Sequence, residues 1–161
     1  QGMFWIPPTD AMVSRFELYS ETASQAQGQD VPMGEGVTLV RDMFVTETMA
    51  QAEELAGQAF LRYMEWVCHF RGLSNHRYPG EELPETPGKL DLLSYQWLHP
   101  RNMLFGTADY VAEKIHEMKE KLNLQSLLVW SNFPGLDHRT VMDSVHRFTE
   151  EVMPQFSEET N

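Results

Sequence analysis

The chain has 161 residues, enough for one domain with a buried core but fewer than the roughly 250 that a complete (β/α)8 barrel usually needs. Its 24 acidic and 12 basic residues leave a net charge of −12, which argues against binding to nucleic acid or to an anionic membrane surface. The only cysteine, Cys68, excludes an internal disulfide and a cysteine-rich metal site, and no apolar run approaches the ~20 residues of a membrane span.

The N-terminus has no basic region followed by an apolar stretch, so a secretory signal peptide is not indicated and we expect a cytoplasmic protein. Gln1 is not an initiator residue, and an initiator methionine is not normally removed before glutamine. We therefore expect the chain to begin inside a longer gene product.

The first part of the chain predicts a helix, a buried strand and a second helix. Pro7 and Pro8 precede a helix in which apolar residues from Met12 to Ala23 recur with helical spacing. Residues 37–45 are apolar and β-branched on both faces, which is typical of a strand in a parallel sheet or barrel. Thr46 is the expected N-cap of the next helix, which extends to about residue 70.

Residues 72–103 interrupt this alternation. Proline and glycine recur through the segment, interleaved with aromatic side chains. A loop of this length inside a compact domain is usually functional or disordered, and aromatic residues favour packing over disorder. We interpret the segment as a lid, with Tyr95, Trp97 and His99 as its candidate functional side chains.

Residues 104–156 predict a helix, a short turn, a buried strand, a Pro-Gly loop and a last helix. Thr107 is a suitable N-cap, and Leu127–Trp130 is the predicted strand. Apolar residues from Val141 to Val152 follow a helical period. This arrangement is one αβα unit of an α/β barrel. We therefore expect one partial barrel domain over residues 1–156, followed by an acidic tail at 157–161.

The predicted element order is α, β, α, lid, α, β, α. Alternation of this kind indicates parallel strands with covering helices, so the fold class is α/β. We expect the C-terminal part of a TIM-like (β/α)8 barrel, with two parallel strands, covering helices and a long excursion at 72–103. Two strands cannot shield both faces of a sheet, so further strands are expected from absent residues or from another chain.

In α/β barrels the site lies at the C-terminal ends of the strands. This rule selects two patches, residues 41–44 and residues 130–133. Trp130 and Asn132 could flank a planar ring and bond its edge, although spacing alone favours Trp130 as a core residue and Asn132 as a turn residue. Arg41 could hold an anion, or it could pair with Asp42 or Glu47.

Other kinds of chemistry have no support in the sequence. The six histidines show no metal-ligand spacing, so no metal site is expected. Gly34 and Gly36 precede a strand, whereas the glycines of a dinucleotide fingerprint follow one. Ser131 and Ser144 lack the context of a serine nucleophile. No residue can be assigned as a general base.

Four segments together resemble the C-terminal end of the bacterial-luciferase-like flavin-dependent monooxygenases. They read VTLVRDMFVTETMAQAEELA from residue 37, LFGTADYVAEKI from residue 104, LLVWSNFPGL from residue 127 and SVHRFTEEVMPQF from residue 144. The resemblance implies a TIM-like barrel, usually dimeric. It implies reduced FMN (in some branches the deazaflavin F420), oxidation of a small organic substrate by O2, and a separate flavin reductase. The flavin carries the oxygen chemistry, while the protein orients it and excludes water.

The resemblance also implies roles for particular residues. Trp130, Asn132 and Phe133 would contribute to the cofactor or substrate site from one strand end, and Arg41 and Met43 from the other. Much of the flavin contact in this family comes from earlier strands that have no counterpart here, so the chain alone is expected to be inactive. Two alternatives stay open: a non-catalytic half-barrel partner or flavin-binding subunit, and a small self-contained α/β binding domain.

Overall fold

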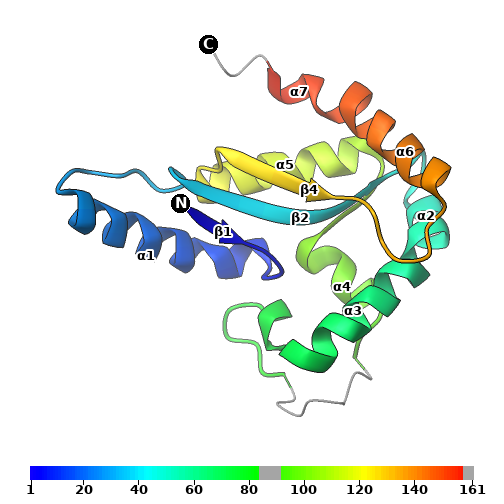
Figure 1. Ribbon diagram of the computed structural model, residues 1–161, viewed down its shortest axis with the longest axis horizontal. Helices are drawn as coiled ribbons and strands as arrows, with labels where there is room; N and C mark the ends of the chain where they lie inside the picture. The colour runs from blue at the N-terminus through cyan, green and yellow to red at the C-terminus, as the bar shows by residue number, and fades with distance from the viewer. Residues whose placement is uncertain (84–91, 158–161) are drawn as a thin grey trace.

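A parallel sheet lies at the centre of the fold (Figure 1). The computed structural model describes residues 1–83 and 92–157, and within them the sheet has four strands. The second strand is central: the last strand pairs with one of its edges, while the first and third pair end to end along the other. The strands are β1 (Gly2–Phe4), β2 (Val37–Val45), β3 (Met103–Gly106) and β4 (Ser126–Trp130).

The two strands predicted from the sequence are present as β2 and β4, but the expectation of only two strands is wrong. β1 has three residues and β3 has four, so neither is long enough to show a periodic pattern. β3 also ends directly before the predicted cap Thr107, so its residues read as the start of a helix. Hydrogen bonding to β2, rather than local sequence, makes both segments strands.

The helices α1 (Thr9–Gln27) and α5 (Ala108–Leu122) cover one face of the sheet. Their apolar stripes pack against the odd-numbered side chains of β2, including Leu39 and Met43. The predicted N-cap of α5 is confirmed, because the Thr107 hydroxyl accepts the amide of Tyr110 at 3.3 Å.

The C-terminal helices extend the same layer. α6 (His138–Arg147) continues into a π-helix (Phe148–Val152) and then α7 (Pro154–Ser157). The amide of Val45 donates to the Ser144 hydroxyl at 2.7 Å, which joins α6 to the end of β2. The predicted acidic tail lies outside the described residues from position 158 onward.

A second group of helices covers part of the opposite face. It comprises α2 (Met49–Ala52), a π-helix (Glu53–Gly57), α3 (Gln58–Arg71) and α4 (Tyr95–Asn102), with a 3-10 turn at Ser74–His76. Thr46 is not the N-cap of this segment. The Thr48 hydroxyl accepts the amide of Gln51 at 3.2 Å, while the Thr46 hydroxyl donates to the Thr48 carbonyl. No helix in the described residues is long and apolar enough to cross a membrane.

The remaining part of that opposite face is open. Directly paired residues of a sheet point to the same side, so Met3, Thr38 and Leu128 share a face with Trp130. Met3, Leu128 and Trp130 are exposed by 67%, 41% and 50%. Because parallel sheets normally bury both faces, this surface is a place where the described residues do not complete the core.

Candidate functional site

The end of β4 presents an exposed indole at the margin of the open sheet face. Trp130 is the last residue of β4, and its Nε1 donates to the backbone carbonyl of Asn132 at 2.9 Å. This hydrogen bond fixes the ring across the strand end. The contact uses the Asn132 backbone and leaves the Asn132 side chain exposed.

Asp42 lies beside Trp130, since the two residues are direct partners in the β2–β4 ladder. Asp42 is fully buried, and its Oδ2 accepts a hydrogen bond from Trp5 Nε1 at 3.2 Å. The other oxygen, Oδ1, has no hydrogen-bond partner among the described residues. Burial raises the pKa of this carboxyl to about 7, against the opposing effects of the Trp5 hydrogen bond and the Arg41 charge.

Asp42 falls within the strand-end patch 41–44 selected from the sequence, but the sequence pattern assigned it no role in the site. A carboxyl that changes protonation near neutral pH is suited to holding or releasing a proton, and perturbed groups of this kind concentrate at functional sites. The available clue was a charged residue inside a strand that is apolar on both faces. Trp5 closes over Asp42 and stacks on Tyr63, with ring centroids 6.0 Å apart. The carboxyl therefore lies beneath an aromatic layer.

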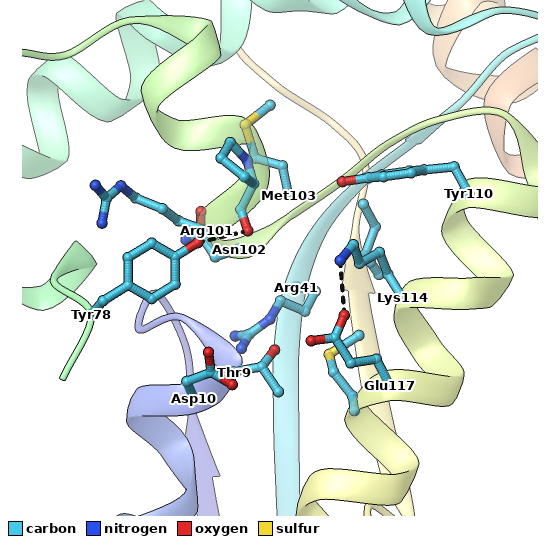
Figure 2. A pocket seen from close by; sticks show the side chains of 13 residues that line it. Thr9, Asp10, Arg41, Tyr78, Arg101, Asn102, Met103, Tyr110, Lys114 and Glu117 are labelled. Atoms are coloured by element: carbon cyan, nitrogen blue, oxygen red, sulfur yellow. Dashed lines mark hydrogen bonds and ion pairs between the residues drawn. The ribbon is translucent and has the colours of Figure 1, made fainter.

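Arg41 and Met43 do not join this group. They alternate with Asp42 along β2, so their side chains lie on the face covered by α1 and α5. Arg41 is 1% exposed and lines a cavity with Lys114 and other polar residues (Figure 2). Met43 is packed in the apolar core of that face. The first strand-end patch is thus divided by the sheet: Arg41 and Met43 lie on the face opposite Trp130, whereas Asp42 lies on the same face as Trp130.

Phe133 is a core residue. β4 ends at Trp130, so strand alternation does not continue through residues 131–133. The Phe133 ring packs edge-on against Phe60, with centroids 5.3 Å apart, and lies 5.5 Å from Phe105. It supports the loop after β4 from beneath.

The three predicted lid residues lie on the helix α4, whose first residue is Tyr95. All three side chains contact the body of the fold. Tyr95 is 7% exposed and its hydroxyl has no partner in the described residues, while His99 Nε2 donates to the Phe105 carbonyl at 2.7 Å. Trp97 lies beneath the Arg101 guanidinium at 4.0 Å. Residues 84–91 of the predicted lid are outside the described part of the chain.

Tyr95 and His99 also line a hollow of about 350 Å³, together with Met49, Glu53 and Gln96. Glu53 begins the π-helix and accepts a hydrogen bond from Gln96 at 2.6 Å, which ties α4 to the segment after β2. π-helical turns often occur at functional sites. This hollow lies next to the C-terminal ends of β2 and β3, because Met49 contacts Gly106.

A metal centre is not indicated within the described residues, where no three histidine, cysteine or acidic side chains form a group that could hold an ion. His76 is buried and its Nε2 lies 3.6 Å from the Cys68 sulfur. Burial lowers the pKa of His76 to about 4, with a further contribution from the Arg101 charge, so this histidine is neutral at physiological pH. The pair is a packed element of the core around α3.

The fold defines a class of protein. No protein-family model matches the chain, and no curated protein sequence matches it. Solved structures do match it over nearly its whole length, and among them are three monooxygenases and a riboflavin lyase. The likeness that the sequence shows to luciferase-like flavin monooxygenases is confirmed at the level of the fold.

Three of these structures illustrate the match. The FMN-bound oxygenating constituent of 3,6-diketocamphane monooxygenase from Pseudomonas putida, a type II Baeyer–Villiger monooxygenase, superposes on 95% of the chain with a TM-score of 0.71 and 21% identity. Monooxygenase RslO1 from Streptomyces bottropensis matches 96% of the chain with a TM-score of 0.67 and 18% identity. EDTA monooxygenase from Chelativorans sp. BNC1 matches 98% of the chain with a TM-score of 0.56 and 16% identity. The matched part is 41–42% of each of these proteins.

Proposed function

We propose that this chain is the C-terminal portion of a luciferase-like flavin-dependent monooxygenase, in which reduced FMN and O2 oxidise a small organic substrate. The observation that carries the proposal is the match of at least 95% of the chain to monooxygenases of which it spans about two fifths. In the whole enzyme, β1 to β4 would belong to a TIM-like barrel. The remaining strands would cover the open face around Trp130.

The residues of the open face suit a flavin or its substrate. Trp130 offers a half-exposed indole held by its bond to the Asn132 carbonyl, and Leu128 adds exposed apolar surface on the same face. The orphaned Oδ1 of Asp42 is a buried polar atom that a neighbouring donor could satisfy. A bound reduced flavin would supply the activation of O2.

Each residue then has a defined task. Trp130 and Asn132 would orient a planar group at the strand end, and Phe133 would support their loop from the core. Asp42 would hold a proton beneath Trp5. Helix α4 would cover the site at the C-terminal ends of β2 and β3, with Tyr95, Trp97 and His99 anchoring it. Excluding water from such a site prevents wasteful side reactions of a reduced flavin.

The proposal also includes the assembly around the chain. A homodimer and a separate flavin reductase follow from the family resemblance, and we keep the expectation of a cytoplasmic location. Further strands are favoured because an uncovered apolar sheet face is unfavourable in water. The exposed residues of this face include Met3, Leu128 and Trp130.

The test compares two exposed tryptophans. Trp130→Ala should weaken binding of FMN or substrate roughly tenfold or more, because aromatic stacking on a planar ring is lost. Trp66→Ala is the matched control, since Trp66 is 64% exposed on α3 and its ring contacts its own helix neighbour Phe70. Flavin binding is followed by FMN fluorescence in the natural gene product. Turnover is followed by the absorbance of reduced flavin after mixing with O2.

A gene product that neither binds FMN nor forms an oxidised product with reduced FMN and O2 would contradict the proposal. Equal effects of the two tryptophan substitutions would remove Trp130 from the site while leaving the family assignment in place.

The alternative function is a non-catalytic partner that completes a shared barrel or binds flavin without turnover. The same open face favours it, because a second chain could cover that surface. Native mass spectrometry separates the possibilities. A stable folded species at 18.6 kDa would contradict both the half-barrel partner and the incomplete enzyme, and would favour a self-contained binding domain.

A further inference from the structure

A polar cavity lies where the edge pairing of β2 is interrupted. β1 pairs with β2 only as far as Leu39, and β3 begins to pair at Asp42, so Val40 and Arg41 face a break between them. The cavity beside this break has a volume of about 240 Å³ and lies between α1, α4 and α5 (Figure 2). We refer to it as the Arg41 cavity. It is on the opposite face of the sheet from Trp130.

Arg41 contributes a buried cation to the cavity. Its side chain is 1% exposed, and its two hydrogen bonds go to backbone carbonyls, from Nη1 to Val40 at 3.0 Å and from Nη2 to Pro7 at 2.9 Å. No carboxylate of the described residues forms an ion pair with it. Asp42 interacts with Arg41 electrostatically but points to the other side of the sheet. A buried guanidinium without a contacting counter-ion is costly.

The other charges around the cavity are already paired. Lys114 contacts Glu117 at 2.8 Å, Lys121 contacts Asp10 at 2.6 Å and also Glu117, and the Arg101 guanidinium is held by both oxygens of Glu81 at 2.7 Å. Among the lining residues, three cations (Arg41, Arg101 and Lys114) face two carboxylates (Asp10 and Glu117). The wall therefore carries one excess positive charge, in a protein whose net charge is −12.

The N-terminus of α1 opens into the same space. Thr9 and Asp10, the first two residues of this 19-residue helix, line the cavity. The N-cap is Pro8, which has no side-chain acceptor for the first helical amides. Such amides and the helix dipole favour a bound anion. The Thr9 hydroxyl also has no hydrogen-bond partner among the described residues.

We propose that the Arg41 cavity is a binding site for a small oxyanion, a phosphate or carboxylate group, held between the Arg41 guanidinium and the N-terminus of α1. The planar guanidinium can donate two parallel hydrogen bonds to such a group. The Thr9 hydroxyl supplies a further donor, and the charge of the anion balances that of Arg41. At about 240 Å³ the cavity is smaller than the 300–1,000 Å³ typical of organic-ligand sites, which favours a small group.

The experiment is calorimetric titration of inorganic phosphate into the protein at constant ionic strength. We expect a single site whose affinity falls roughly tenfold or more in Arg41→Gln and a few-fold in Thr9→Val. Arg15→Gln, which removes an equal charge from an exposed position on α1, should bind phosphate as the wild type does. Parallel titrations with acetate and with glycerol phosphate distinguish a free phosphate, a carboxylate and the phosphate group of a larger molecule.

Because Arg41→Gln could fail to fold, the wild-type protein supplies a second measurement. The Nε–H resonance of the buried Arg41 should shift on addition of phosphate, and exposed arginine signals should not. Absence of binding, binding that survives Arg41→Gln, or an Arg41 resonance that does not respond would each overturn the proposal. These outcomes are independent of the proposed flavin site, which would lie on the other face of the sheet.

Discussion

Arg41 and Asp42 are neighbours in β2, and each is almost completely buried, yet their side chains lie on opposite faces of the sheet. One charge therefore faces the polar cavity under α1, while the other lies beneath Trp5 and beside Trp130. The two groups interact through the sheet without contact. This separation leaves each charge with capacity for a further partner on its own side.

Asp42 should make the protein less stable as the pH rises. Burial raises its pKa to about 7 in the folded state from 3.8, so the folded protein binds an extra proton between these values. The contribution of Asp42 to the free energy of unfolding is most favourable below its unfolded-state pKa of 3.8, and it is lost as the pH rises to about 7. Relative to Asp42→Asn, the free energy of unfolding of the wild type should fall by roughly 2–3 kcal/mol from pH 5 to pH 8.

Urea unfolding of both proteins at the two pH values measures this difference. Asp30→Asn, in an exposed loop, is the control and should follow the wild type at both. Parallel pH profiles for the wild type and Asp42→Asn would contradict the assigned pKa.

Ser144 should contribute to stability through one backbone amide. Its hydroxyl accepts the buried amide of Val45 at 2.7 Å, and Ser144→Ala would leave that amide without a partner. We expect a loss of about 1–3 kcal/mol in the free energy of unfolding. Thr149→Ala, which removes an exposed hydroxyl bonded to the His146 carbonyl, should cost less than about 0.5 kcal/mol. Equal losses in the two variants, measured by urea unfolding, would count against the role of Ser144.

Substitution by alanine should destabilise the protein more at Gly34 than at Gly28. Both have positive φ, of 89° and 69°, so both substitutions strain the backbone. A Cβ at Gly34 would lie 2.0 Å from the carbonyl oxygen of Asn123, whereas one at Gly28 meets nothing within 4 Å. Gly28→Ala should cost about 1 kcal/mol, and Gly34→Ala roughly 3 kcal/mol or more. Thermal unfolding midpoints of the two variants compare them directly, and similar midpoints would refute the contact with Asn123.

Arg101 should hold α4 in place. Its guanidinium bonds both oxygens of Glu81 at 2.7 Å and lies over the rings of Trp97 and Tyr78. Lysine cannot reproduce the bidentate and stacked geometry, so Arg101→Lys should destabilise this region by about 1–3 kcal/mol. Hydrogen exchange of the α4 amides should accelerate, while the amides of α5 keep their rates. Arg15→Lys is the control, and unchanged exchange in α4 would show that other contacts anchor it.

The predictable parts of the fold were those with long local patterns. The residues from Val37 to Val45 are apolar on both faces, which is a direct consequence of burial in a parallel sheet, and Thr107 shows the composition of an N-cap. β1 and β3 could not be predicted because three or four residues carry no period. Thr48 rather than Thr46 is the cap, because the Thr46 hydroxyl donates to the backbone carbonyls of Thr48 and Gly106.

The candidate site likewise combines features that local sequence patterns predict with features that depend on tertiary contacts. The amino-acid sequence by itself determined the α/β class, the main helices, the strands β2 and β4, and Trp130 as a residue at a strand end, because each depends on contacts within a short segment. Only the tertiary structure decided that Arg41 and Trp130 lie on opposite faces, that Phe133 is core, and that Asp42 is buried beneath Trp5. These outcomes depend on strand register and on helices distant in the chain, which no local pattern encodes.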